Sequence, residues 1–220
     1  MKKTILTLFV LTSMLAIVSC KNEATTTSDA NETVVASAET TTYKLDLKNS
    51  IVNWKGTKPT GAHIGTIQFS EGKAIVNNGV LEGGTFVFDM NSITVTDLKS
   101  GDGKEDLETH LKGTGDKAGE DHFFNVGKFP KGSFEITKVL SEKGKTTVTG
   151  NLILKEISKS ITIPAVVTAD ENSITLKSEP FMINRTEWNI NYASKSVFDN
   201  LKDKFVDDNI ELTVSFKAVK

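Results

Sequence analysis

Residue types that could support catalysis occur in few useful combinations in this sequence. The single cysteine, Cys20, follows an apolar N-terminal run, and neither a GxSxG motif nor a glycine-rich phosphate loop after a strand is present. The adjoining carboxylates Asp207-Asp208 and Glu120-Asp121 would face opposite ways on a strand. The three histidines show neither HxH nor HExxH spacing. We therefore expect no catalytic residue, no metal site and no cofactor, and a protein that is not an enzyme.

Arg185 is the most informative polar residue, because it continues the alternation of Ile183 and would direct a permanent cation toward an interior. A buried guanidinium must be paired or meet an anion, and its planar fork suits a phosphate or carboxylate. We therefore predict that Arg185 binds the head group of a ligand. The alternatives are an internal ion pair with Glu187 or Asp46, or a strand break at Asn184 that turns Arg185 outward.

His63 is the second candidate for contact with a head group. It shares the alternation of Ile67 and Phe69 and follows Gly61, which places it near one end of its strand. There it could donate a hydrogen bond to a ligand. A histidine satisfied by backbone carbonyls is the alternative.

Large apolar side chains are the candidates for contact with an apolar tail, since such a tail needs a dry channel with few polar groups. Phe123 and Phe124 form an aromatic pair in a long loop. The others lie on the apolar face of their expected strands: Trp54, Phe86, Phe88, Phe134, Phe181 and Ile183. For each of these residues, packing in an ordinary core is the alternative.

The elements that must position these residues are strands. Short segments with alternating apolar residues recur from residue 43 onward, separated by turns rich in Gly, Asn and Asp. Residues 102–111 are expected to form a short helix, and residues 194–204 a second helical turn. The hairpin-like connections and about eight or more strands predict an all-β antiparallel barrel, because closure removes exposed sheet edges. Such a barrel is either filled by side chains or holds one small ligand.

The N-terminal residues predict export. Residues 1–19 contain two lysines and then an apolar run too short for a comfortable transmembrane helix, as in a secretory signal. The ending Ile17-Val18-Ser19-Cys20 resembles the bacterial lipobox. The resemblance implies that Cys20 carries acyl chains, palmitate among them, and that these chains anchor the protein to a membrane. An ordinary signal with an incidental cysteine is the alternative. Residues 20–42 are expected to be a disordered tether after the lipidated cysteine, and residues 43–220 one folded domain.

The composition excludes two further classes of protein. One cysteine cannot form a disulfide within its own chain. The balance of 26 Lys and Arg against 28 Asp and Glu lacks the basic excess needed for binding to a phosphate backbone. We therefore expect no nucleic-acid partner, and the sequence leaves the oligomeric state open, with a homodimer among the options.

Nine short stretches occur in a characteristic order over residues 43–218. They are VNWKG at 52–56, GAHIGTI at 61–67, GGTF at 83–86, MNSI at 90–93, HLK at 110–112, FFNVGKFP at 123–130, VTGNL at 148–152, ITIP at 161–164 and NRTEWNI at 184–190. Together they resemble the YceI-like family of polyisoprenoid-binding proteins. The resemblance implies an extended lipocalin-like barrel that holds a long isoprenoid or similar lipid, for binding, transport or storage.

Two features depart from the family pattern. Residues 113–122 are longer than the usual link, which affects the shape of the pocket mouth. Asn125 and Asn184 stand where the family commonly has Asp, which changes how the neighbouring loop and Arg185 are held.

The sequence as a whole predicts a lipoprotein of the bacterial cell envelope, anchored to a membrane on its periplasmic or surface face, the outer membrane included. Its barrel would hold a long apolar amphiphile such as a polyisoprenoid, for carriage, storage or sequestration. Two alternatives remain: an enzyme acting on a lipid or glycan at the barrel mouth, and a structural or stress protein whose barrel is filled by side chains.

Overall fold

The structure is a computed structural model, and it describes residues 23–33, 39–142 and 145–220. The strands in these ranges are β1 (Ser28–Asp29), β2 (Thr41–Leu45), β3 (Ile51–Lys58), β4 (Gly61–Asn77), β5 (Val80–Val95), β6 (Lys131–Glu142), β7 (Lys145–Leu154), β8 (Ile157–Ala169), β9 (Ser173–Ser178), β10 (Phe181–Asn184) and β11 (Asn209–Val219). The helical elements are α1 (Lys104–Lys112) and the short 3₁₀ turns η1 (Leu47–Asn49), η2 (Gly115–Lys117), η3 (Arg185–Trp188) and η4 (Lys202–Lys204).

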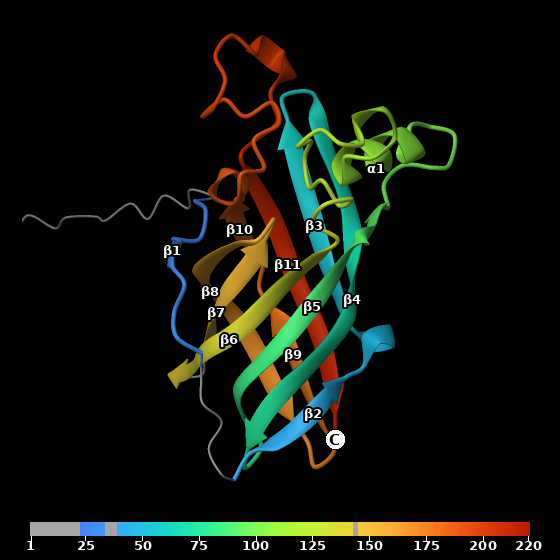
Figure 1. The fold of residues 1–220 in the computed structure, drawn as a ribbon. Helices are drawn as coiled ribbons and strands as arrows, with labels where there is room; N and C mark the ends of the chain where they lie inside the picture. Colours follow the sequence, from blue (N-terminus) through green and yellow to red (C-terminus); the bar gives the residue numbers. More distant parts are fainter. Residues whose placement is uncertain (1–22, 34–38, 143–144) are drawn as a thin grey trace, which may run out of the picture.

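The strands close into a ring (Figure 1). From β3 to β9 each strand pairs antiparallel with the next one along the chain. β9 then pairs with β11, and β11 pairs with β3. The predicted all-β antiparallel barrel is therefore confirmed.

The long strands keep one apolar face inside because bulges correct their alternation. In β4 the inward positions pass from Ile67 and Phe69 to Ala74 and Val76, on either side of an irregular register near residues 69–71. A bulge adds one residue, so it reverses which parity faces inward while it bends the strand. The strand of 17 residues can therefore curve around the barrel and still present apolar side chains to the interior.

The helical predictions are met in part. The helix expected at residues 102–111 is present as α1, with slightly shifted bounds. It is tied to the barrel by a hydrogen bond from the backbone N–H of Val95 on β5 to the carboxylate of Glu108 in α1 (2.9 Å). Residues 194–204 form an extended loop that contains only η4. Among the described residues, no helix has the length and apolar content needed to span a bilayer.

Part of the expected disordered tether lies against the barrel. We call residues 25–31 the N-terminal strap. The N–H of Thr25 donates to the carbonyl of Met182 on β10 (2.7 Å), and β1 pairs with β8. Asn31 and Asn151 exchange two hydrogen bonds, each of 2.8 Å. In this structure residues 25–31 of the expected tether therefore contact the barrel, and the composition gives no sign of this because backbone pairing to a strand edge does not depend on residue type.

Candidate ligand-binding site

The barrel contains a cavity of about 500 Å³. Its wall is predominantly apolar and is built from β3 to β11 together with the loops at one end. The structure brings all ten residues predicted for tail or head group to this one cavity: Trp54, His63, Phe86, Phe88, Phe123, Phe124, Phe134, Phe181, Ile183 and Arg185.

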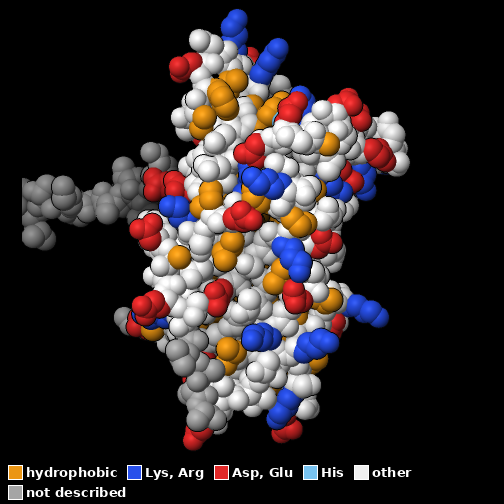
Figure 2. Space-filling model, viewed as in Figure 1, with side chains coloured by type: hydrophobic (Ala, Val, Ile, Leu, Met, Phe, Trp, Pro, Cys, Tyr) orange, Lys and Arg blue, Asp and Glu red, His pale blue; other side chains and the backbone are white. Residues whose placement is uncertain are grey.

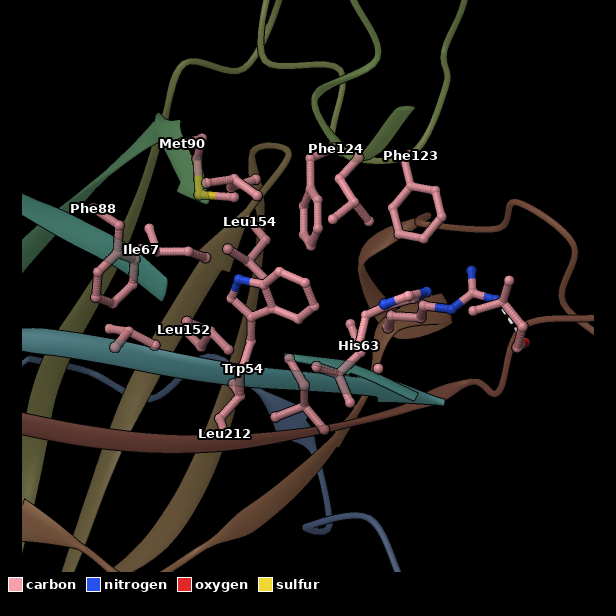
Figure 3. A pocket seen from close by; sticks show the side chains of 18 of the residues that line it. Trp54, His63, Ile67, Phe88, Met90, Phe123, Phe124, Leu152, Leu154 and Leu212 are labelled. Atoms are coloured by element: carbon pink, nitrogen blue, oxygen red, sulfur yellow. Dashed lines mark hydrogen bonds between the residues drawn. The ribbon is translucent and has the colours of Figure 1, made fainter. Parts of the chain in front are cut away.

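Trp54 lies across the cavity (Figure 3). Its cross-strand partner is Gly65, where a Cβ would lie 2.4 Å from the Trp54 ring and 1.9 Å from the carbonyl oxygen of Thr94. Only glycine leaves room for the indole, so Gly65 fixes the ring against the wall. The indole Nε1 is buried and has no hydrogen-bond partner among the described residues, which leaves one donor unsatisfied in an apolar chamber.

Phe123 and Phe124 cover the cavity from the loop that follows α1 and point down into it (Figure 3). Phe123 has φ +47°, in the left-handed region that a bulky side chain rarely adopts. The conformation is held by hydrogen bonds from the loop to α1, namely Phe124 N–H to the carbonyl of Leu111 (3.2 Å) and Val126 N–H to that of Lys112 (2.9 Å). These hydrogen bonds offset the strain at Phe123 and so hold both rings over the cavity.

A buried lysine ties this loop to the segment after η3. The Lys155 side chain is 4% exposed, and its Nζ lies 2.6 Å from a carboxylate oxygen of Asp121. The same Nζ donates to the carbonyl of Asn189 (3.0 Å). A buried ammonium without partners is costly, so these two contacts hold both loops together.

The phenylalanines deeper in the barrel both line the cavity and pack against one another. The Phe86 and Phe216 rings are stacked at 4.4 Å between centroids, and Phe69 and Phe88 lie 5.3 Å apart. The sequence presented core packing and contact with a tail as alternatives for these residues. In the structure the same side chains pack against one another and line the cavity.

Arg185 is fully buried and its donors are engaged by the protein. Nε donates to the carbonyl of Asp207 (3.1 Å), Nη2 to that of Val206 (3.0 Å), and Nη1 to that of Ile190. Nη2 also lies 3.5 Å from the Asp208 carboxylate. The predicted interior orientation is correct, but the geometry assigns Arg185 to holding two loops rather than to a free head-group site. Its ion-pair partner is neither of the two acids considered from the sequence.

His63 lies at the rim of the cavity, partly exposed. Its Nδ1 is 2.9 Å from the Asp97 carboxylate, and the second oxygen of that carboxylate accepts from the backbone N–H of Ile64 (3.0 Å). Because a carboxylate accepts hydrogen bonds, Nδ1 is the donor in this contact, which leaves Nε2 to meet other groups.

The remaining two histidines form a pair at the mouth, which sequence spacing did not reveal. His122 Nε2 lies 2.9 Å from His110 Nδ1, and the ring of Tyr192 packs against both. Burial lowers the pKa of His110 to about 4 and also lowers the pKa of His122, with nearby Lys117 acting in the same direction. Among the described residues, no group of three or more His, Cys, Asp or Glu side chains is placed to hold a metal ion.

A family model for the YceI-like domain matches residues 43–218. The chain belongs to the YceI-like family. Similar solved structures include BcnA from Burkholderia cenocepacia (18% identity, TM-score 0.61, covering 79% of this chain and 99% of BcnA). A polyisoprenoid binding domain from Saccharophagus degradans is also similar (13% identity, TM-score 0.56, covering 80% of this chain and 97% of that domain). No curated protein matches this chain.

Both departures from the YceI-like pattern act at the mouth. The longer link at residues 113–122 contributes His122 to the histidine pair. Asn125 donates to Asp121 (3.3 Å), while Asn184 accepts from the N–H of Thr186 (3.0 Å) and so caps η3. The two amides therefore still organise their loops, and Asp208 supplies the negative charge beside Arg185.

Sequence reasoning missed several polar residues at the mouth of this YceI-like barrel. Lys58 at the end of β3 and Lys204 in η4 line the cavity, and neither forms an ion pair with another described residue. The Thr57 hydroxyl donates to the Asp207 carboxylate (2.6 Å), which joins the hairpin to the segment before β11. None of these belongs to an alternating strand pattern that would single it out.

We expect Arg185→Gln to lower the free energy of unfolding by about 3–5 kcal/mol, because it leaves Asp208 and several carbonyls buried without their cation. Binding of a neutral prenol and of its phosphate should weaken together. Urea denaturation and ligand titration measure the two effects, with Lys138→Gln, at an exposed position on β6 away from the cavity, as a control that changes stability by less than about 0.5 kcal/mol. Unchanged stability with selective loss of phosphate binding would contradict this role.

Acidification should destabilise the protein between pH 6.5 and 4. In the unfolded chain a histidine titrates near its ordinary pKa of about 6.5, whereas burial keeps His110 neutral down to about pH 4. The unfolded state therefore takes up protons first, and stability present above pH 6.5 is lost as the pH falls. Carboxylates such as Asp121, whose pKa the hydrogen bond from Lys155 lowers, contribute mainly below this window.

Urea midpoints measured across this pH range check the assignment. His110→Gln should flatten the fall, because it removes the histidine whose pKa burial lowers most clearly. Equal slopes for His110→Gln and the unsubstituted protein would show that the pair does not control acid stability.

Proposed function

We propose that this YceI-like protein is an envelope lipoprotein that binds a long apolar amphiphile, of the polyisoprenoid class or similar, inside its barrel. The role would be carriage, storage or sequestration of the lipid rather than its chemical conversion. The observation that carries the proposal is the apolar cavity of about 500 Å³ within a closed barrel. This volume lies within the range of small-molecule sites.

Burial of the tail would supply the affinity. Roughly 300 Å² of apolar ligand surface removed from water contributes about 7.5 kcal/mol at ~25 cal/mol per Å². Only the part of such a burial energy that exceeds the cost of association appears as affinity, so a longer buried tail binds more tightly. The family relationship supports such a ligand, since the similar Saccharophagus degradans domain is described as polyisoprenoid binding.

Polar groups would select the rest of the ligand. The unpartnered Trp54 Nε1 favours an amphiphile with a hydroxyl or carbonyl oxygen within its reach. At the rim, His63, Lys58 and Lys204 can meet a polar head group, and neither lysine has an ion-pair partner in the part of the chain that the structure describes, whereas Arg185 is already engaged. The sequence predicted that Arg185 binds the head group. In this proposal the rim residues make that contact instead.

Membrane attachment would proceed through acylated Cys20, which lies outside the described residues. The lipobox-like ending and the charged, apolar order of residues 1–19 support this assignment. Several acyl chains would make the anchor lasting, because a single chain is only marginally retained. Because the tether keeps the barrel beside a bilayer, the effective concentration of lipid near the cavity would be high.

The two alternatives fit the geometry less well. A barrel filled by side chains disagrees with the cavity. An enzyme at the mouth would use Arg185 and His63 as charge-stabilising groups, but Arg185 already contacts backbone carbonyls and Asp208, and His63 contacts Asp97.

Native mass spectrometry after detergent-free purification tests the binding directly. We expect a co-purifying prenyl lipid, or uptake of added prenol at one molecule per chain. Ile67→Trp, on the cavity wall, should weaken uptake by narrowing the chamber, whereas Val166→Trp, at an exposed position on β8, should not. Equal uptake by both variants would contradict binding in the cavity, and a chemically altered lipid would favour an enzyme.

Trp54→Phe keeps an aromatic ring and removes the indole N–H. We expect it to weaken binding of a prenol about fivefold, the equivalent of ~1 kcal/mol for one hydrogen bond, and to leave binding of the matching hydrocarbon unchanged. Isothermal titration with the two ligands measures the difference. Equal losses for both ligands would mean that Trp54 contributes only shape.

A further inference from the structure

The barrel carries exposed apolar side chains at its mouth. We call residues 191–205 the rim loop, which lies at the top of Figure 1 and in Figure 2 shows hydrophobic and basic side chains close together. Tyr192, Val197 and Phe198 in this loop are 41%, 47% and 48% exposed. Large apolar side chains grouped on one loop mark an interaction surface more often than side chains scattered singly.

The rim loop also forms part of the mouth. Tyr192, Lys204 and Phe205 line the cavity from the loop, and Lys195 lies over the ring of Phe205 at 3.3 Å from its centroid. Aromatic residues interleaved with lysines are typical of a membrane interface, where rings sit at headgroup level and lysine ammonium groups stay in water. With three lysines against Asp199 and Asp203 the loop has a net charge of only +1, so apolar contact would outweigh attraction to anionic lipid.

The N-terminal strap brings the chain to this same end. Thr25 is bonded to Met182 on β10, and β10 leads directly through η3 into the rim loop. Cys20 precedes Thr25 by five residues, which span at most roughly 17 Å when extended. The opposite end of the barrel, at the hairpin before Val80, lies at the far end of β4, whose 17 residues would span on the order of 55 Å if the strand were straight.

We propose that the rim loop docks on the lipid bilayer that holds the anchor, so that the mouth of the cavity faces the membrane. This inference rests on the proposed acylation of Cys20. The short reach from Cys20 to the strap favours a bilayer over a second copy of the chain as the surface that covers Val197 and Phe198. A lipid could then pass between bilayer and cavity without crossing water.

The test uses the full chain, processed in a bacterial host and reconstituted in phosphatidylcholine vesicles. An environment-sensitive fluorophore is attached at Phe198→Cys, and at Val80→Cys as a matched control, exposed at the opposite end. We expect the probe at position 198 to shift to shorter wavelength and to be quenched by brominated lipid at least threefold more than the probe at position 80. Vesicles with added phosphatidylglycerol should give nearly the same result.

The outcomes separate failure of docking from failure of the anchor. If Cys20 reacts with the thiol reagent and the protein does not float with the vesicles, acylation is wrong and the docking inference falls with it. If the protein floats but the two probes are quenched equally, the anchor stands and docking is refuted. A probe at position 198 that is shielded yet unquenched by brominated lipid would show that protein covers the loop, which also overturns the proposal.

Discussion

Closure of an antiparallel sheet into a ring is the constraint on which the rest of this structure depends. Because side chains alternate along a strand, closure sends every second one inward, and the bulges of β4 preserve that alternation where the strand must bend. The ring contains space that its inward phenylalanines do not fill, so a chamber remains. The packing of the wall requires glycine at position 65, since the ring of Trp54 occupies the space that any larger side chain would need.

Charge is used at the mouth to fix loops. Arg185 and Lys155 are both buried, and both donate hydrogen bonds to backbone carbonyls of loop segments. These segments have no regular secondary structure that would otherwise fix their position. Each of the two cations also meets one carboxylate, from Asp208 and Asp121 respectively. The loops that frame the cavity are therefore positioned by buried cations, which leaves the partly exposed rim residues to meet a ligand.

Strand alternation made much of the site predictable from sequence. It correctly directed Trp54 and Phe86 toward one interior, because parity decides which face a strand residue occupies, whereas Arg185 lies in η3, just beyond the end of β10. It could not show the partners of Arg185, since Asp208 and the carbonyls of Val206 and Asp207 lie more than twenty residues further along the chain, and the carbonyl of Ile190 depends on how the turn after η3 folds. The contact of His122 with His110 was likewise hidden, because it depends on how a longer link folds. The docked strap was missed because backbone pairing is indifferent to composition.

Photo-crosslinking with a diazirine-bearing prenol tests the central claim, that the barrel interior holds the lipid, most directly. After irradiation and proteolysis, mass spectrometry locates the labelled residues. The account predicts labels on inward residues spread over several strands, such as Ile67, Phe88 and Leu212, with excess unlabelled prenol suppressing them. Labels confined to exposed apolar residues such as Val166 and Leu140, or labelling that excess prenol does not suppress, would contradict it.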